Sequence, residues 1–197
     1  MPAKFVFIRH GNAMTPVAGQ DDKNRPLSPL GLTQALNRGQ KIGLIGKGPN
    51  FHSPARRTKE TGQLAVAHLR NGSGSELTPI PELFSIPDSG DDEKLAALFA
   101  KLKYSSLAEY YRHDTPLMER CAKAGADGIR RELNRWQEQQ EKMAESVVVF
   151  GHAVILQAIA VAMFPDADYR VLGELILGEA EGFMVLEDGV TIVLHHD

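Results

Sequence analysis

Cysteine is nearly absent from this sequence, in which Cys121 is the only one. A single cysteine excludes an internal disulfide framework and is compatible with a reducing compartment. No secretory leader is expected either, because the first apolar run, residues 5–8, is short and meets charge directly. We therefore expect a cytoplasmic protein in which Cys121, on an apolar helical stripe, belongs to the core.

An excess of positive charge and an uninterrupted apolar run of membrane length are missing as well. The net charge of −3 gives no indication of a nucleic-acid-binding surface. The longest mostly apolar stretch, residues 147–164, is interrupted by Gly151-His152 and closed by Pro165. A buried strand, a turn and a buried helix explain this stretch better than a membrane span does. We expect neither nucleic acid nor a membrane as a partner.

The sequence does contain an alternation of short apolar strands with amphipathic helices. β-branched and aromatic runs at residues 4–8 and 147–150 predict buried strands. Helical spacing follows Ser28-Pro29, Ser53-Pro54 and Pro116, where proline favours the first turn of a helix. This alternation predicts an α/β fold, a three-layer α/β/α sandwich with a mostly parallel central sheet.

Weaker patterns complete the predicted secondary structure. Leu32, Ala35 and Leu36 predict the buried face of the first helix. Residues 76–83 predict an edge or irregular strand, because they contain two prolines. Glu187-Asp188-Gly189 separates two apolar runs and predicts a C-terminal hairpin.

The length of the chain is that of one domain. Residues 88–145 differ in composition from the rest and contain two predicted helices. We therefore expect a single domain over residues 1–197 with a helical insertion at about 88–145.

Two histidines stand directly after predicted buried strands. Arg9-His10-Gly11 follows the first strand, and Gly151-His152 follows the strand at 147–150. Ligands of open α/β sheets bind beyond the carboxyl ends of the strands, so we expect both imidazoles in one pocket. Paired histidines beside an arginine indicate an enzyme site for an anion.

Two further segments complete a recognisable order. They are Arg25-Pro26-Leu27-Ser28-Pro29-Leu30-Gly31 and Ser53-Pro54-Ala55-Arg56-Arg57, the latter continuing to Thr61. With the two histidine segments, they resemble the histidine phosphatase (phosphoglycerate mutase-like) superfamily. The resemblance spans nearly the whole chain except about 88–145, and its spacing selects Arg57 over Arg56.

The resemblance implies a phosphatase that needs no metal and no other cofactor. It implies that His10 is transiently phosphorylated, and that Arg9, Arg57 and His152, with Gly11, bind the phosphoryl group. Elementary chemistry agrees, because guanidinium binds phosphate through paired, charge-assisted hydrogen bonds. A neutral imidazole is also a good nucleophile.

The proton donor for the leaving group has several candidates. Relatives carry a carboxylate just after the strand predicted at 76–83, so Glu82 is the first choice. The usual glycine spacing is missing here, which leaves Asp88, Asp91 and Asp92 as rivals. The alternative for Glu82 is a solvated carboxylate at the end of a strand.

Three polar residues near these motifs have two readings each. Ser53 is an N-cap of its helix or a hydrogen-bond partner of phosphorylated His10. Arg25 stabilises its loop or lines the pocket. Arg56 is a surface residue that faces Glu60 four positions on, or a contact to substrate.

Ala13 and the Arg-Pro-Leu of residues 25–27 look more like SixA-type phosphohistidine phosphatases than like the mutase branch. We therefore expect a phosphomonoester or phosphohistidine hydrolase whose partner is a phosphorylated small molecule or a phosphoprotein. The alternatives are a phosphoglycerate-type mutase and a module that binds a phosphorylated ligand without turnover. The sequence leaves the oligomeric state open.

Overall fold

A central sheet organises the molecule, whose computed structural model describes all residues except 1–3, 43–47, 70–75, 87–89, 187 and 196–197. The strands are β1 (Lys4–Arg9), β2 (Asn50–His52), β3 (Leu77–Pro79), β4 (Ser146–Gly151), β5 (Gly182–Leu186) and β6 (Thr191–Leu194). Their order across the sheet is β3-β2-β4-β1-β5-β6. The four strands from β3 to β1 are parallel, whereas β5 and β6 form an antiparallel hairpin at one edge. The predicted parallel sheet and C-terminal hairpin are confirmed.

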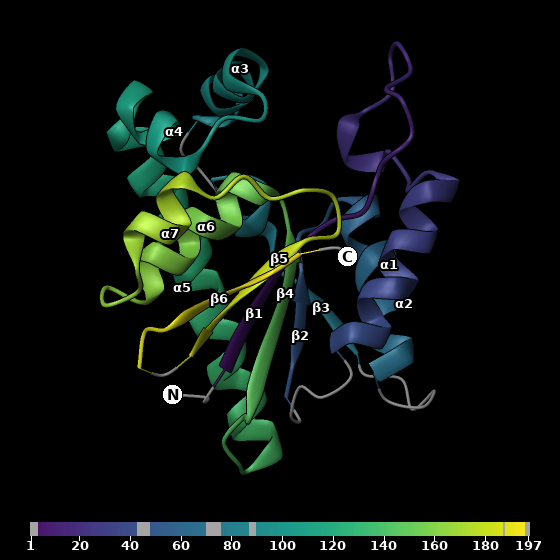
Figure 1. Ribbon diagram of the computed structural model, residues 1–197, viewed down its shortest axis with the longest axis vertical. Helices are drawn as coiled ribbons and strands as arrows, with labels where there is room; N and C mark the ends of the chain where they lie inside the picture. The colour runs from purple at the N-terminus through teal and green to yellow at the C-terminus, as the bar shows by residue number, and fades with distance from the viewer. Residues whose placement is uncertain (1–3, 43–47, 70–75, 87–89, 187, 196–197) are drawn as a thin grey trace.

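Helices cover both faces of this sheet (Figure 1). They are α1 (Pro29–Ile42), α2 (Arg56–Leu69), α3 (Asp92–Leu102), α4 (Leu107–His113), α5 (Thr115–Gln140), α6 (Ala153–Met163) and α7 (Tyr169–Glu174), with short 3-10 helices η1 (Asp22–Asn24) and η2 (Pro81–Leu83). Helices α1 and α2 lie on one side of the sheet and α5, α6 and α7 on the other, which confirms the three-layer sandwich. Within the described residues, no helix is both long and apolar enough to cross a membrane.

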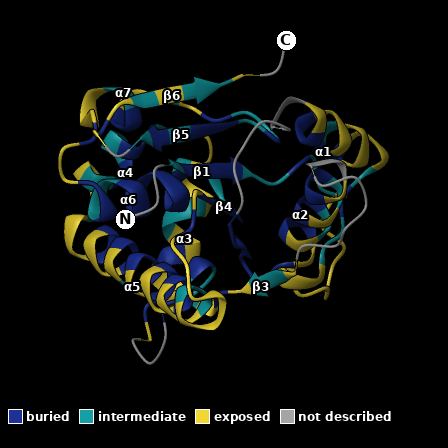
Figure 2. Ribbon diagram, turned by 90° about the horizontal axis from the view of Figure 1, so that it is seen from below, coloured by how far each residue is buried: buried dark blue, intermediate teal, exposed yellow. Residues whose placement is uncertain are grey.

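Alternation of side chains along the strands builds a core on each face of the sheet. Phe5 and Phe7 of β1 pack in the larger core with residues of α5 and α6, whereas Val6 and Ile8 pack with α2. Successive side chains of a strand point to opposite faces, so one apolar run supplies both cores. Figure 2 shows the result, a buried sheet between helices whose outer faces are exposed.

The structure corrects two details of the predicted elements. The strand predicted at 76–83 covers only β3, and η2 follows it, because the prolines remove backbone donors that a longer strand needs. On α1, Leu32 and Leu36 are exposed, whereas Arg38 is buried at 2% exposure. The Arg38 guanidinium donates hydrogen bonds to the carbonyls of Ala180 and Leu194 at 2.6 and 3.1 Å, which ties α1 to the C-terminal segments.

Residues 88–145 do not behave as one unit. Helix α5 is a layer of the sandwich, and its predicted apolar stripe is buried, Cys121 included. Helices α3 and α4, the second of which the sequence did not predict, lie over the end of the sheet instead (Figure 1). The division into one domain with an insertion at 88–145 stays a prediction. Of the helices in this range, only α3 and α4 lie over the end of the sheet, where they could cover a site as a lid.

Two glycines bring the turn after β1 against the start of α1. A Cβ atom on Gly31 would lie 2.0 Å from the carbonyl oxygen of Asn12, and one on Gly11 would lie 2.7 Å from that of Gly31. The Ser28 hydroxyl accepts a hydrogen bond from the Gly31 amide at 3.1 Å, as an N-cap does, and donates one to the side-chain oxygen of Asn12. The residues after His10 are thereby held in place by α1.

We expect Gly31→Ala to lower the free energy of unfolding by roughly 1–3 kcal/mol, because the added methyl group overlaps backbone. Gly173→Ala in α7 is the matched control, since its Cβ would make ordinary contacts at 3.4 Å or more. Alanine favours a helix over glycine, so this control should be neutral or slightly stabilising. Urea unfolding followed by circular dichroism measures both, and equal midpoints would contradict the close packing.

Candidate active site

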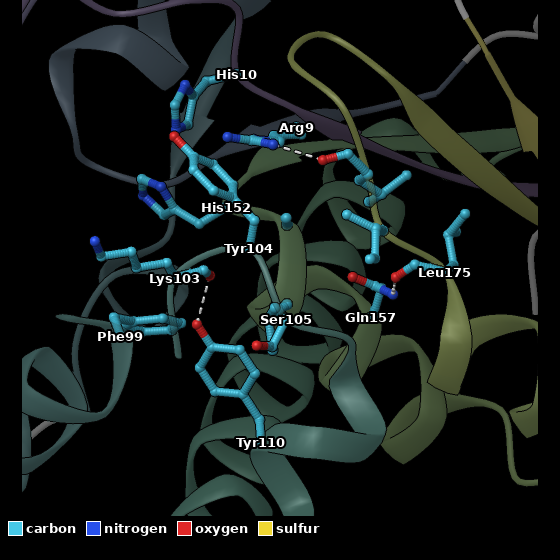
Figure 3. Close-up of a pocket in the computed structure, with 14 residues that line it drawn as sticks. Arg9, His10, Phe99, Lys103, Tyr104, Ser105, Tyr110, His152, Gln157 and Leu175 are labelled. Atoms are coloured by element: carbon cyan, nitrogen blue, oxygen red, sulfur yellow. Dashed lines mark hydrogen bonds between the residues drawn. The ribbon is translucent and has the colours of Figure 1, made fainter. Parts of the chain in front are cut away.

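Three strand ends bring the candidate residues together. β1 ends at Arg9 and is followed by His10, β4 is followed by His152, and β2 is followed by Ser53. The pairing of Arg9 with Gly151 sets the two histidines side by side, with ring centroids 5.2 Å apart. The close-up in Figure 3 shows both rings and Arg9 at one end of a pocket.

The surroundings of the His10 ring select one tautomer. Nδ1 lies 2.7 Å from the carbonyl oxygen of Gly11, which can only accept, so Nδ1 carries the proton. Nε2 then has a lone pair, and the Nε–H of Arg57 points to it at 3.3 Å. This is the arrangement of a nucleophilic imidazole, with one nitrogen held and the other available.

Both imidazoles are neutral at physiological pH. Burial, followed by the charge of Arg57, lowers the pKa of His10 from 6.5 to about 3, although its hydrogen bond to Gly11 acts in the opposite direction. Burial and then His10 and the neighbouring guanidinium groups bring the pKa of His152 well below its ordinary value. Neither ring has to lose a proton before it can act.

Arg57 is the buried cation of the site, and all three of its nitrogens have partners. Besides Nε on His10, Nη1 donates to the backbone carbonyl of Asp22 at 2.7 Å and Nη2 to the Asp22 carboxylate at 2.8 Å. The other oxygen of that carboxylate lies 2.9 Å from Nη2 of Arg25. Asp22 therefore bridges two arginines at the edge of the site.

The sequence reasoning missed Asp22. The available signal was its spacing of three residues from Arg25 in a polar loop that follows His10, which suits an ion pair across one turn. The carboxylate contacts Nη2 of Arg57, one of the nitrogens that a phosphoryl group needs. An anion that binds Arg57 in this way must displace or share it.

Arg25 fits the first of the two readings that the sequence left open, and it is not among the described residues that line the pocket. Its guanidinium stabilises the loop through Asp22 and a 3.4 Å contact to the carbonyl of Met14. It also contributes to the lowered pKa values of His10 and His152, so its charge acts inside the site. Among the described residues, its buried Nε has no hydrogen-bond partner.

Ser53 and Arg56 are also located by the structure. Helix α2 begins at Arg56, two residues later than the Ser53 N-cap would require. The Ser53 hydroxyl accepts a long hydrogen bond of 3.5 Å from the Ala55 amide and lies 3.1 Å from Nε2 of His152. Arg56 is exposed and pairs with Glu60 at 2.7 Å, which is the surface reading. The structure thus brings Arg57, and not Arg56, to His10.

Gly11 contributes differently from the role that the resemblance implies. Its amide donates to the Thr61 hydroxyl at 3.1 Å, and that hydroxyl donates to the carbonyl of Arg57 at 2.7 Å. The amide is therefore engaged within the protein and is not directed at a phosphoryl group. Gly11 allows the close packing of the turn after β1 against Gly31. The Thr61 hydroxyl connects this turn to α2, the helix that carries Arg57.

The structure places Glu82 outside the pocket. Pro81 starts η2, and the Glu82 carboxylate pairs with Arg131 of α5 through contacts of 2.9 and 3.3 Å. Burial alone would raise the pKa of Glu82, but the hydrogen bonds and charge of Arg131 bring it below its ordinary value. An ionised carboxylate in an ion pair is a poor proton donor, so this geometry does not favour the predicted acid.

The rival acids are no better placed. Asp88 lies outside the described residues. Asp91 pairs with Arg120 at 2.8 Å and Lys94 at 3.0 Å, and an oxygen of Asp92 accepts from the Ile86 amide. Asp91 and Asp92 are thus engaged in the structure around α3.

The pocket next to His10 has a volume of about 130 Å³ and two unlike ends. Arg9, His10 and His152 form one end, where Nη1 of Arg9 donates to the carbonyl of Leu177 at 2.5 Å. Residues of α3, the α3–α4 turn, α4, α6 and the segment after α7 supply the other walls. In the described part of the chain, no group of three histidine, cysteine, aspartate or glutamate side chains is arranged to hold a metal ion. Independence from metal stays a prediction.

One comparison with known proteins identifies a family. A model of the histidine phosphatase superfamily, branch 1, matches residues 5–173. A search of curated proteins finds no match. The fold is similar to that of a mutant of phosphoserine phosphatase from Entamoeba histolytica in complex with phosphoserine, with a TM-score of 0.60, 18% identity and coverage of 96% of this chain and 94% of the other.

Two further solved structures share the fold. Phosphoglycerate mutase from Bacillus anthracis has a TM-score of 0.59 at 18% identity, over 97% of this chain and 91% of the other. The protein histidine phosphatase SixA complexed with tungstate has a TM-score of 0.54 at 17% identity, over 96% and 93%. Phosphatases and a mutase are therefore found on this fold at low identity.

The lowered pKa of His10 predicts that its ring stays neutral far below pH 6.5. Nitrogen-15 NMR of labelled protein should show the neutral Nδ1–H tautomer of His10 from about pH 7.5 down to about pH 5. The His10→Ala variant assigns the signal. A titration midpoint near the ordinary histidine value would contradict the buried, arginine-flanked ring.

The position of Asp22 predicts that it competes with anions for Arg57. We expect Asp22→Asn to lower the dissociation constant for inorganic phosphate by about 3- to 10-fold, or about 0.7–1.4 kcal/mol. Asp21→Asn is the matched control, because it removes the same charge from a neighbouring carboxylate that only accepts from the amide of Lys23. Isothermal titration calorimetry measures both, and equal or weaker phosphate binding by Asp22→Asn would contradict competition.

Proposed function

This chain belongs to the histidine phosphatase superfamily, and on that basis we propose that it hydrolyses phosphomonoesters or phosphohistidine through a phosphohistidine on His10. The observation that carries the proposal is the state of the His10 ring. It is half-buried and neutral, with Nδ1 fixed by Gly11 and Nε2 facing Arg57. A ring held in this way needs no base to become a nucleophile.

In the first step, the Nε2 lone pair of His10 forms a bond to phosphorus, while the bond from phosphorus to the leaving group breaks and its electrons pass to that group. The Nε–H of Arg57, which points to that lone pair in the free protein, then donates to a phosphoryl oxygen. Arg9 and His152 line the same end of the pocket and bind the remaining oxygens. Donors already in place for the developing charge lower the barrier, because they need little reorganisation.

In the second step, water attacks the phosphorus of phosphohistidine. The electrons of the P–N bond return to Nε2, and the ring regains the neutral state that burial favours. Arg57 releases phosphate and can again pair with the Asp22 carboxylate, which lies 2.8 Å from its Nη2 in the free protein. Return of this carboxylate assists product release, because it competes for Nη2 of Arg57.

The residues that line the pocket indicate which substrates suit the site. No carboxylate is among the described residues that line it, so acid assistance from aspartate or glutamate is not provided there. Substrates with good leaving groups, such as phosphohistidine and aryl phosphates, depend least on such assistance. We propose a cytoplasmic enzyme whose substrate is a phosphorylated small molecule or a phosphoprotein, and which works without metal.

Hydrolysis of p-nitrophenyl phosphate in the presence of a chelator tests the proposal. We expect turnover by the wild type and a loss of about 10³-fold or more in His10→Ala, because the covalent route is removed. Substantial activity in His10→Ala would overturn the nucleophile, and loss of wild-type activity in chelator would overturn independence from metal. Turnover that requires a bisphosphate primer would identify a mutase instead.

Neighbouring arginines provide a matched pair of variants. Arg57→Ala should lower kcat/KM by about 10²–10³-fold, the cost of losing a donor to the transition state. Arg56→Ala removes the same charge from an exposed ion pair and should change kcat/KM by less than about 3-fold. The reverse order would show that the structure assigns the wrong arginine to the site.

A further inference from the structure

The structure leaves the proton donor for the leaving group unassigned, since Glu82 pairs with Arg131 away from the pocket. We propose that Tyr104, on the turn between α3 and α4, donates this proton. The inference rests on the proposed function and identifies how the enzyme handles esters with poor leaving groups. It places the proton donor on the turn between α3 and α4, which lie over the end of the sheet, and not at the end of β3.

The turn that carries Tyr104 is held in a defined conformation. Lys103 has a φ of 49°, a left-handed conformation that strains a residue other than glycine by roughly 1–3 kcal/mol. Two hydrogen bonds of 2.8 Å hold Lys103 in this conformation. Its amide donates to the carbonyl of Phe99, and the buried Tyr110 hydroxyl donates to the carbonyl of Lys103. A strained turn held in this way fixes the direction in which the Cα–Cβ bond of Tyr104 leaves the chain, while the side chain itself is 70% exposed.

The other hydroxyl groups of the pocket are engaged. That of Tyr110 donates to the Lys103 carbonyl, and burial raises its pKa to about 12. That of Ser105 donates to the carbonyl of Leu102 at 2.7 Å. Among the hydroxyl groups of the described pocket residues, only that of Tyr104 has no hydrogen-bond partner within the protein.

The Tyr104 side chain also points toward His10. In Figure 3 its side chain extends from the turn toward His10, with the hydroxyl at the His10 end, while the Lys103 side chain extends in a different direction. The Tyr104 ring lies 5.6 Å from the guanidinium carbon of Arg9. Because Arg9 is itself held by the Leu177 carbonyl, a fixed positive charge lies beside the ring.

The reaction balances with Tyr104 as acid and then as base. As Nε2 of His10 bonds to phosphorus, the electrons of the ester P–O bond pass to the leaving oxygen. The phenol proton of Tyr104 moves to that oxygen and an alcohol leaves. The guanidinium of Arg9 lies over the ring of the resulting phenolate, as it does over the ring of the neutral side chain. Water then attacks phosphohistidine, gives its proton to the phenolate and restores both residues.

The test compares leaving groups in the Tyr104→Phe variant, which keeps the ring beside Arg9 and removes only the hydroxyl. We expect kcat/KM for an alkyl phosphate such as glycerol 3-phosphate to fall by about 10²-fold, the low end of acid assistance. For p-nitrophenyl phosphate, whose leaving group needs little protonation, the change should stay below about 3-fold. A structural defect would instead lower both rates alike.

Two control variants complete the experiment. Tyr169→Phe makes the same change on an exposed tyrosine that does not line the pocket, and Glu82→Gln removes the carboxylate paired with Arg131. Neither should alter the preference between the two esters. A selective loss in Glu82→Gln, or equal losses on both esters in Tyr104→Phe, would overturn the assignment.

Failure of the proposed function has a different outcome. Wild-type protein that hydrolyses neither ester contradicts the hydrolysis of phosphomonoesters and the inference with it. Wild-type protein that hydrolyses both esters, together with an unchanged ester preference in Tyr104→Phe, contradicts only the role of Tyr104.

Discussion

Parallel pairing of β1 with β4 is the interaction on which the site depends. It places Arg9 opposite Gly151, so the residues that follow, His10 and His152, emerge together at the same edge of the sheet. The His10 amide continues the ladder by donating to the carbonyl of Gly151 at 3.0 Å. A shift of one residue in this register would turn every side chain of β1 to the other face and separate the two rings.

Burial of charge and of neutral imidazole in one place gives the site its chemistry. The fold keeps His10 and His152 neutral because protonated rings would lie, desolvated, beside guanidinium groups. The cation of Arg57 is compensated from outside the sheet, by Asp22 on the loop after β1. The protein therefore carries an internal anion at the point where the proposed function requires a phosphoryl group to bind.

The two ends of the pocket are built by different parts of the fold. Strand ends supply the phosphate end, where backbone hydrogen bonds fix each residue closely. The turn between α3 and α4 supplies the other end, where it carries Tyr104 and strain at Lys103 holds its conformation. Such a division allows the leaving-group end to vary while the phosphoryl chemistry stays the same.

The sequence by itself determined the local features: the strands, the hairpin, the Ser28 cap, and the order of motifs that indicates Arg9, His10, Arg57 and His152. These depend on neighbours in the chain, whose spacing is visible. Tertiary structure alone decided that Glu82 pairs with Arg131, 49 residues away, and that Arg57 pairs with Asp22, 35 residues before it. It also decided that the buried face of α1 contains Arg38 and not Leu32, which was expected there. Ion pairs and burial of this kind depend on which helix packs beside which loop, and no local spacing records that.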